Sequence, residues 1–149
     1  MKIARMLAAF VLFALLGPGS AFAQHGQKGT HEQLAIGGYC PVAYVAMNKA
    51  MKPDGKITAT YQGHTYAFMN QDAKKMFEAE PAKFAPKYDG VCATAVAMGQ
   101  KMESDPELFS VYKNELYLFS NKEAKAAFEK DPAMTVAKAD KQWAVLSKK

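Results

Sequence analysis

One segment of this chain occurs twice, and this duplication constrains the fold more than any other feature of the sequence. Residues 61–84 and 112–135 align at a fixed offset of 51 positions and share 10 identities in 24 positions. The shared residues of the first copy are Tyr61, Tyr66, Phe68, Asn70, Ala73, Lys74, Phe77, Glu78, Pro81 and Ala82. Self-similarity at a fixed period indicates one structural unit built more than once, and two copies predict a paired module rather than a solenoid.

Each copy has the pattern of a β-hairpin followed by a helix. Residues 57–61 and 65–69 are rich in β-branched and aromatic residues and flank a short turn at Gly63, which predicts two strands. Asn70 is then placed to cap a helix, and Pro81 is placed to end it. The second copy repeats these signals with Asn114 in the turn, Asn121 at the cap and Pro132 at the end.

The predicted domain organisation follows from this repeat. The repeat units span residues 57–88 and 108–139. We expect one compact α+β domain over residues 34–149, made of the duplicated β-hairpin–helix unit with additional short helices. The two hairpins are expected to share or abut sheets, with the helices packed over them. Residues 24–33 contain Gly, Lys and His but no apolar periodicity, and they predict a disordered leader.

The first 23 residues have the three parts of a secretory signal peptide. Lys2 and Arg5 form a basic start, residues 6–16 are an uninterrupted apolar run, and an Ala-Phe-Ala cleavage pattern ends at Ala23. The apolar run is shorter than the roughly 20 residues that a membrane-spanning helix needs. We therefore expect cleavage before Gln24 and a periplasmic or secreted protein with no membrane span in the mature chain.

The charge of the mature chain argues against nucleic acid as a partner. Removal of Lys2 and Arg5 lowers the formal net charge from +5 to +3. Arg5 is also the only arginine of the sequence, so the mature chain has none. Bidentate contacts to phosphate and to guanine are made mainly by arginine. The expected partner is instead a metal ion or a periplasmic protein.

The only two cysteines are the residues that most restrict the function. Cys40 precedes Pro41, a residue type favoured at the first helical position, so Cys40 is the predicted N-cap of a helix. Residues 91–102 follow an Asp-Gly turn signal and predict a helix of small residues with Cys92 in its first turn. A helix N-terminus favours the thiolate form of cysteine. Either cysteine is therefore a candidate for soft-metal binding or redox chemistry.

Residues 38–44 have the sequence Gly-Tyr-Cys-Pro-Val-Ala-Tyr, and residues 90–96 have the sequence Gly-Val-Cys-Ala-Thr-Ala-Val. These segments resemble two motifs of exported YHS-domain proteins, usually written Gly-Tyr-Asp-Pro-Val-Ala-Tyr and Gly-Tyr-Cys-Ala-Tyr-Ala-Val. The resemblance extends over Tyr61, Gly63, Tyr66, Phe68, Phe77, Pro81, Lys83, Phe84 and the segment 137–143, with Asp140 and Trp143. It implies a YHS-like unit over most of the chain from about residue 34.

The departures from the family pattern imply a role for Cys40. It stands where the exported group most often has Asp and where related members carry selenocysteine, so the resemblance implies a ligand or reactive position. Heavy-metal-binding relatives have Cys-Pro-Val-Cys and then Phe-Cys-Ser-x-x-Cys. Cys40 is the only one of those four cysteines in this chain, which excludes an all-cysteine zinc site within it. Met69 stands at one of the three remaining positions.

Cys40, Cys92 and Met69 form the candidate metal site. Thiolate and thioether ligands select Cu(I), for which a low coordination number suffices. The predicted function is an exported, non-catalytic protein that binds or handles a soft metal ion, with Cu(I) favoured.

The other side chains that could donate to a metal ion are expected to have ordinary structural roles. Met47 with Met51, and Met98 with Met102, are spaced i,i+4 and would add thioethers. The ordinary role of methionine, however, is to fill gaps in a core, and we expect that role for each of them. His64 is expected at the tip of a turn, exposed to solvent.

The alternative is a structural or interaction module with a Cys40–Cys92 disulfide and no metal. Two cysteines commonly pair in an oxidising compartment, and this bridge would contribute about 4 kcal/mol in the chain-entropy model. Exported YHS proteins that have Asp at position 40 keep the second cysteine, which argues against a required bridge. A thiol-redox protein is a third hypothesis.

No catalytic residue is assigned from the sequence. Motifs for Ser-His-Asp or Cys-His catalysis, a C-x-x-C redox pair, a glycine-rich phosphate loop and HExxH do not occur. Tyr39 and Tyr44 flank Cys40 and are expected to line the core. We therefore do not expect an enzyme.

Overall fold

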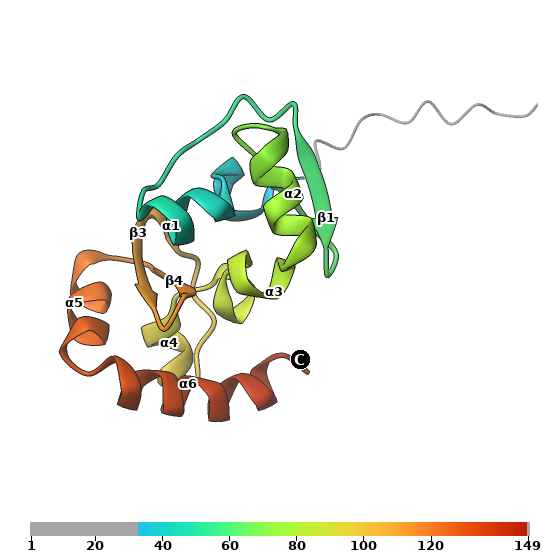
Figure 1. Ribbon diagram of the computed structural model, residues 1–149. Helices are drawn as coiled ribbons and strands as arrows, with labels where there is room; N and C mark the ends of the chain where they lie inside the picture. Colours follow the sequence, from blue (N-terminus) through green and yellow to red (C-terminus); the bar gives the residue numbers. More distant parts are fainter. Residues whose placement is uncertain (1–32, 149) are drawn as a thin grey trace, which may run out of the picture.

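The structure of this chain, a computed structural model, describes residues 33–148 (Figure 1). The predicted signal peptide, residues 1–23, and all but the last residue of the predicted leader 24–33 lie outside the described residues. Residues 33–148 contain six α-helices and two small antiparallel sheets. The α+β fold class is therefore confirmed. No helix in this part of the chain is both long enough and apolar enough to span a membrane.

The chain passes through the same order of elements twice. Each half has a 3-10 helix, a short α-helix, two strands and two further α-helices. The first half contains η1 (Ala35–Gly38), α1 (Pro41–Met47), β1 (Thr58–Tyr61), β2 (His64–Ala67), α2 (Gln71–Ala79) and α3 (Pro81–Phe84). The second half contains η2 (Lys87–Gly90), α4 (Ala93–Ala97), β3 (Asp105–Tyr112), β4 (Glu115–Phe119), α5 (Lys122–Lys130) and α6 (Pro132–Leu146). The repeated series thus begins well before the predicted units, at residues 35 and 87.

The two hairpins form separate two-stranded sheets. β1 pairs with β2 and β3 pairs with β4, both antiparallel. The residues between the strands, Gln62 and Gly63 in one hairpin and Lys113 and Asn114 in the other, all have positive φ. Two consecutive residues with positive φ are what a tight two-residue hairpin turn requires. The predicted first hairpin is present, and its strands end within two residues of the predicted limits.

The two predicted helix caps are present. The side chain of Asn70 accepts a hydrogen bond from the backbone N–H of Ala73 at 2.8 Å, and Asn121 accepts one from Ala124 at 2.7 Å. These bonds begin α2 and α5 by satisfying a backbone N–H that has no partner within the helix.

Pro81 and Pro132 end one helix and begin the next. α2 and α5 stop before these residues, as predicted, but each proline is the first residue of a further helix, α3 or α6. Proline suits this position because its missing N–H would have no helical partner there.

The predicted helix 91–102 is wrong in its length. α4 contains five residues, Ala93–Ala97, and Cys92 is its N-cap rather than a residue of its first turn. The helix ends because Gly99 has φ +79°, a conformation that glycine adopts readily and that terminates helices. The Gly99 N–H donates to the carbonyl of Val96 at 2.8 Å, which completes the C-terminal turn.

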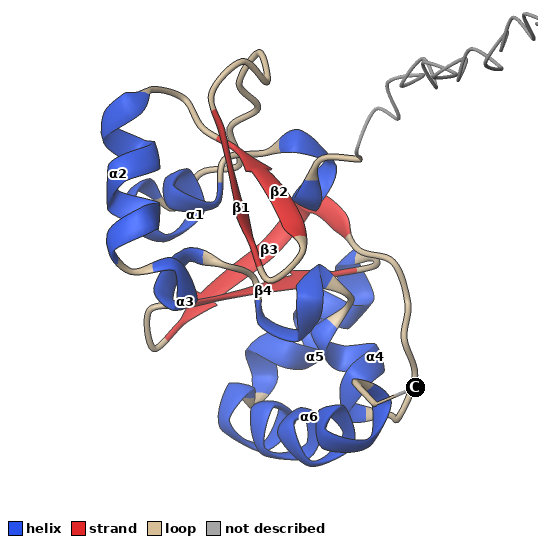
Figure 2. Cartoon of the chain, turned by 90° about the vertical axis from the view of Figure 1, so that its right-hand side faces the viewer, coloured by secondary structure: helices blue, strands red, loops and turns tan. Residues whose placement is uncertain are grey.

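Each half has its own hydrophobic core. The first core consists of Cys40, Val42, Ala43, Tyr66, Phe68, Phe77 and Phe84. The second core consists of Tyr88, Cys92, Ala93, Ala95, Val96, Tyr117, Phe119, Phe128 and Ala139. Figure 2 shows α1, α2 and α3 beside the β1–β2 hairpin, and α4, α5 and α6 gathered beside the β3–β4 hairpin.

A third cluster of buried residues, Tyr44, Leu116 and Leu118, joins the two halves. Tyr44 belongs to α1 and the two leucines to β4. The Tyr44 hydroxyl donates to the carbonyl of Pro106 at 2.7 Å, and its ring packs edge-on against Phe109 at 4.8 Å between centroids. Tyr44 therefore lines the core, as predicted, and it fixes α1 of the first half against the sheet of the second.

Candidate functional site

Cys40 is the N-cap of α1, with Pro41 as the first helical residue, as predicted. Its backbone N–H donates to the carbonyl of Met51 at 2.9 Å, which holds the loop after α1 against the cysteine. The side chain lies in the first core and is 1% exposed. Met51 is half-buried and packs against the same core.

Cys92 occupies the corresponding place in the second half. It is the N-cap of α4, and its backbone N–H donates to the carbonyl of Met102 at 2.9 Å. The side chain is fully buried in the second core. The hydroxyl of Ser120 donates a hydrogen bond to its Sγ at 3.4 Å. The thiol of Cys92 therefore has an oxygen neighbour.

The structure does not bring Cys40 and Cys92 together. Both are free cysteines, and each belongs to the core of its own half. The expectation that they share a disulfide or one metal ion is thus corrected. The physical reason is the repeated architecture, because each cysteine caps the first helix of a separate unit and points into that unit's interior.

Met69, the third predicted ligand, corresponds to Ser120 in the second half. It follows Phe68 directly after β2, as Ser120 follows Phe119 directly after β4, at the same 51-residue offset. Ser120 touches Cys92. Position 69 is therefore the first-half equivalent of the residue that contacts the cysteine in the second half. Its side chain is 40% exposed.

The methionines contradict the expectation that they fill the core. Among the described residues, only Met51 is half-buried, whereas six methionines are exposed. These six are Met47, Met69, Met76, Met98, Met102 and Met134. They account for almost all the large apolar side chains that are exposed within residues 33–148, since the remaining one is Val145. The cores are filled by aromatic rings and small residues instead, which leaves thioethers available to solvent.

No group of three or more His, Cys, Asp or Glu side chains within residues 33–148 is placed to hold a metal ion. The thioether sulfur of methionine, a ligand for soft metals, is not among these four donor types. A soft site at Cys40 would take its further ligands from methionine.

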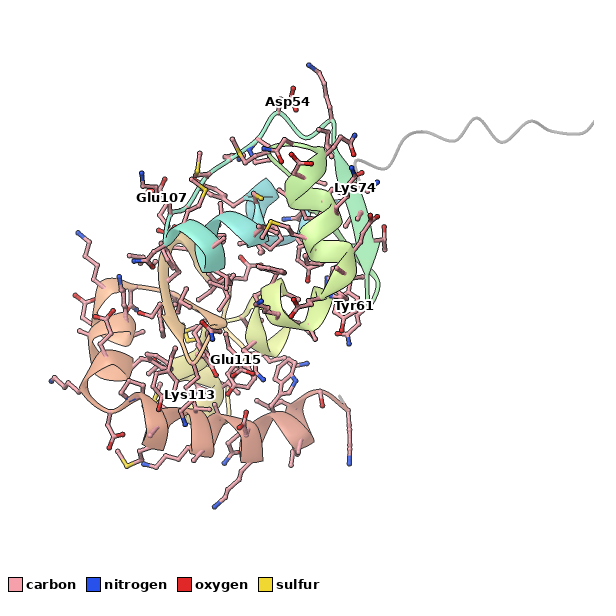
Figure 3. All side chains as sticks on the ribbon, in the orientation of Figure 1. Asp54, Tyr61, Lys74, Glu107, Lys113 and Glu115 are labelled. Atoms are coloured by element: carbon pink, nitrogen blue, oxygen red, sulfur yellow. The ribbon has the colours of Figure 1, made fainter. Side chains whose placement is uncertain are left out.

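The sequence did not indicate a polar cluster within the second half, where η2 lies against β4. Lys87 lies 3.0 Å from Glu115, and Glu115 also accepts a hydrogen bond from the hydroxyl of Tyr117 at 2.7 Å. Burial opposes ionisation of Glu115, but the bonds from Tyr117 and Lys87 outweigh it and lower the pKa of this carboxyl. Figure 3 labels Glu115 together with Tyr61, which comes from the hairpin of the other half.

Tyr88, the next residue of η2, makes a separate polar contact. Its hydroxyl donates to Asp140 at 2.9 Å, and burial followed by this hydrogen bond raises the pKa of Tyr88 far above its ordinary value. The ring of Tyr88 lies 5.7 Å from that of Trp143. Together these groups line a cavity of about 230 Å³ between the halves.

His64 directly follows the two-residue turn Gln62–Gly63 rather than standing at its tip, and it is not exposed as expected. It is the first residue of β2, half-buried, and it lines a second, wider hollow of about 530 Å³ together with Asp89 and Glu103. This arrangement could not be predicted from the sequence, because the three residues come from distant segments.

No protein-family model, curated protein or solved structure matches this chain.

Proposed function

We propose that this chain is an exported protein of the YHS type that binds one soft metal ion, Cu(I), in its first half. The YHS assignment is supported by the motifs at residues 38–44 and 90–96 and by the repeated order of elements, which a duplicated β-hairpin–helix unit would produce. The export is supported by the tripartite sequence of the first 23 residues.

The observation that carries the metal proposal is the hydrogen bond that joins Cys40 to Met51. The backbone N–H of Cys40 donates to the backbone carbonyl of Met51 at 2.9 Å, and the side chain of Met51 packs on the core that contains Cys40. Met69 occupies the position whose second-half equivalent touches the other cysteine. One thiolate and two thioethers are a donor set that selects Cu(I) over harder ions.

The second half lacks this donor set. Ser120 replaces the thioether of Met69, and its hydroxyl bonds to Cys92. A hydroxyl is a harder donor than a thioether and is a poor ligand for Cu(I). The proposed site is therefore specific to the first half, and Cys92 serves as a core residue.

Exposure of Met69 gives the site its route for metal entry and release. Cys40 is 1% exposed, whereas Met69 is 40% exposed and adjacent to the first core along the chain. A metal ion would meet the thioether first and then the thiol, which loses its proton on binding. The protein would hold or transfer the ion without catalysing a reaction, with a periplasmic protein as the exchange partner.

The two cysteines provide a matched pair of variants for the test. Purified protein without residues 1–23 is titrated with Cu(I) under anaerobic, reducing conditions. The expected stoichiometry is one equivalent for the unmodified protein and for Cys92→Ser, and none for Cys40→Ser. Equal losses in the two variants, or no binding by the unmodified protein, would refute the proposal.

A structural or interaction module without metal is the second candidate, and one observation favours it. Cys40 and Cys92 are almost equally buried in equivalent aromatic cores, which is the ordinary environment of a cysteine that acts as a small apolar residue. On this reading, Cys40→Ser and Cys92→Ser would lower the free energy of unfolding by similar amounts, and neither the unmodified protein nor the variants would bind Cu(I).

A further inference from the structure

The cavity at the junction of the halves has three aromatic walls. Tyr61 comes from the end of β1, Tyr88 from η2 and Trp143 from α6. The rings of Tyr88 and Trp143 are 5.7 Å apart at an interplanar angle of 60°. Aromatic faces carry a partial negative charge and attract cations placed over them. The ammonium group of Lys101 already lies 5.3 Å from the Trp143 centroid, and Lys101 does not line the cavity.

The charged groups of the cavity leave it with an excess of negative charge. Lys87 lines the cavity, but its ammonium group forms an ion pair with Glu115 at 3.0 Å. Asp89 and Asp140 also line it, and neither has an ion-pair partner among residues 33–148. Asp140 accepts the Tyr88 hydroxyl at 2.9 Å, which holds one carboxylate oxygen beside the aromatic wall.

Comparison of the two halves shows which features of the η2 turn belong to the repeated fold and which occur only at the cavity. The left-handed turn of η2 contains Tyr88 and Asp89, with φ of 56° and 54°. The turn of η1 has the same conformation at Ile36 and Gly37, with φ of 55° and 58°. The strained turn is therefore part of the repeated unit, whereas the aromatic ring and the carboxylate at this turn occur only in the second half. The carboxylate of Asp89 is therefore not needed for the conformation of the turn, whereas Tyr88, like Ile36 in the first half, also packs against the core of its half.

The volume limits what the cavity can hold. It measures about 230 Å³, below the range of about 300–1,000 Å³ that is typical of sites for drug-sized ligands. A small ligand, or the end group of a longer one, is the size that fits. Aromatic rings combined with unpaired carboxylates are the surroundings in which quaternary and alkyl ammonium groups are recognised.

We propose that this cavity binds the ammonium head group of a small organic cation, placed against the rings of Tyr61 and Trp143 and neutralised by Asp89 and Asp140. This site is separate from the proposed metal site at Cys40 and uses none of its residues. Asp140 and Trp143 also belong to the segment 137–143, which has no role in the proposed metal site.

Trp143 is the only tryptophan of the chain, so its fluorescence reports on the cavity directly. The full mature protein is titrated with choline, and in parallel with 3,3-dimethylbutan-1-ol, a neutral molecule of the same shape. The expected result is a saturable change in fluorescence with choline and none with the alcohol. Calorimetric titration with the same two compounds gives a readout that does not depend on the tryptophan.

Two variants and one control assign the binding to the carboxylates. Asp140→Asn and Asp89→Asn are each expected to weaken choline binding about threefold, because both carboxylates are exposed and solvent screens their attraction to the cation. Asparagine tolerates the left-handed conformation of position 89, so the second variant keeps the turn even if the first disturbs the Tyr88 hydrogen bond. Asp54→Asn, a change at an exposed ion pair with Lys56, is the control and is expected to have no effect.

Two results would overturn the proposal. One is the absence of saturable choline binding by both fluorescence and calorimetry. The other is binding that the neutral alcohol matches or that neither carboxylate variant weakens, because recognition would then rest on shape alone.

Discussion

Cys40 and Cys92 hold the same structural position in the two halves of the chain. Each is the N-cap of the first short α-helix of its half, and each donates its backbone N–H to the carbonyl of a methionine, Met51 or Met102, at 2.9 Å. Both side chains are buried in an aromatic core. The cysteines are thus equivalents of one another rather than partners, and any functional difference between them must come from their neighbours.

The equivalence of the cores predicts similar costs for two substitutions. Phe77 lies 5.0 Å from Tyr66 between ring centroids, and Phe128 lies 5.0 Å from Tyr117. Phe77→Ala and Phe128→Ala should each lower the free energy of unfolding by about 3–5 kcal/mol, since each leaves a cavity in a packed core. Denaturant unfolding monitored by circular dichroism gives this quantity.

The control for this pair is Glu78→Ala, at an exposed position next to Phe77. Its effect should stay within about 0.5 kcal/mol, as for most surface changes. A cost below about 1 kcal/mol for either phenylalanine would mean that its ring is not part of a packed core.

The two asparagine caps predict a smaller and additive effect. Asn70→Ala and Asn121→Ala each remove one hydrogen bond to a backbone N–H, at 2.8 and 2.7 Å. Each should lower the free energy of unfolding by about 1 kcal/mol, and the double variant by the sum, because the caps lie in different halves. Gln71→Ala, at the exposed first residue of α2, is the control. No loss in either single variant would contradict the assignment of these caps.

The features that the sequence predicted correctly depend on local chemistry. Asn70 and Asn121 cap helices, and Gln62–Gly63 and Lys113–Asn114 form the turns, because each signal acts within a few residues. The limits of α2 and α5 before Pro81 and Pro132 follow for the same reason. The sequence patterns did not predict that each proline begins a further helix. Proline ends one helix and is favoured at the start of another, and the same fixed φ angle suits both positions.

The equivalence of the cysteines was missed because the offset changes along the chain. Cys40 and Cys92 are 52 residues apart, whereas the hairpins and helices repeat at 51. The loop between cysteine and hairpin is one residue longer in the first half. Alignment at 52 pairs Gly38 with Gly90 and Ala43 with Ala95, a signal that was present but shorter than the main repeat.

The exposure of the methionines and the cavity between the halves could not be predicted from the sequence, for a different reason. Methionine is an apolar residue, and its burial is decided by which side chains have already filled the core; here aromatic rings fill it. The cavity joins Tyr61, Asp89 and Trp143, which come from three distant segments. Only the packing of the two halves brings them together.

The buried tyrosines predict loss of stability in alkali. Burial raises the pKa of Tyr66 from 10.0 to about 12, with a smaller contribution from the negative charge of Asp89. The unfolded chain therefore releases this proton at a lower pH than the folded chain. The stabilisation is complete below pH 10 and is lost as the pH rises towards 12.

Denaturant unfolding at several alkaline pH values checks this prediction. Burial also raises the pKa of Tyr44, Tyr88 and Tyr117, so the unmodified protein should lose stability steeply. Tyr66→Phe should lose it less steeply over the same range, because one of the contributing protons is absent. Identical slopes for the two proteins would contradict the raised pKa of Tyr66.

Exchange of the equivalent residues Met69 and Ser120 tests why only the first half is proposed to bind Cu(I). Met69→Ser gives the first half the residue of the second and should weaken Cu(I) binding at least about tenfold, a change of about 1.4 kcal/mol. Ser120→Met places a thioether beside Cys92 and should create a second, weaker equivalent. Competition with a Cu(I) chelator measures both. Unchanged affinity in Met69→Ser would remove Met69 from the site.

The most direct test of the central claim is a crystal structure of the mature protein loaded with one equivalent of Cu(I), with anomalous scattering recorded at the copper edge. The account predicts one strong anomalous peak in the first half, bound to Sγ of Cys40 and to the thioether sulfurs of Met51 and Met69, and none beside Cys92. A peak beside Cys92, or copper bound only by surface methionines while Cys40 keeps its unliganded packing, would contradict it.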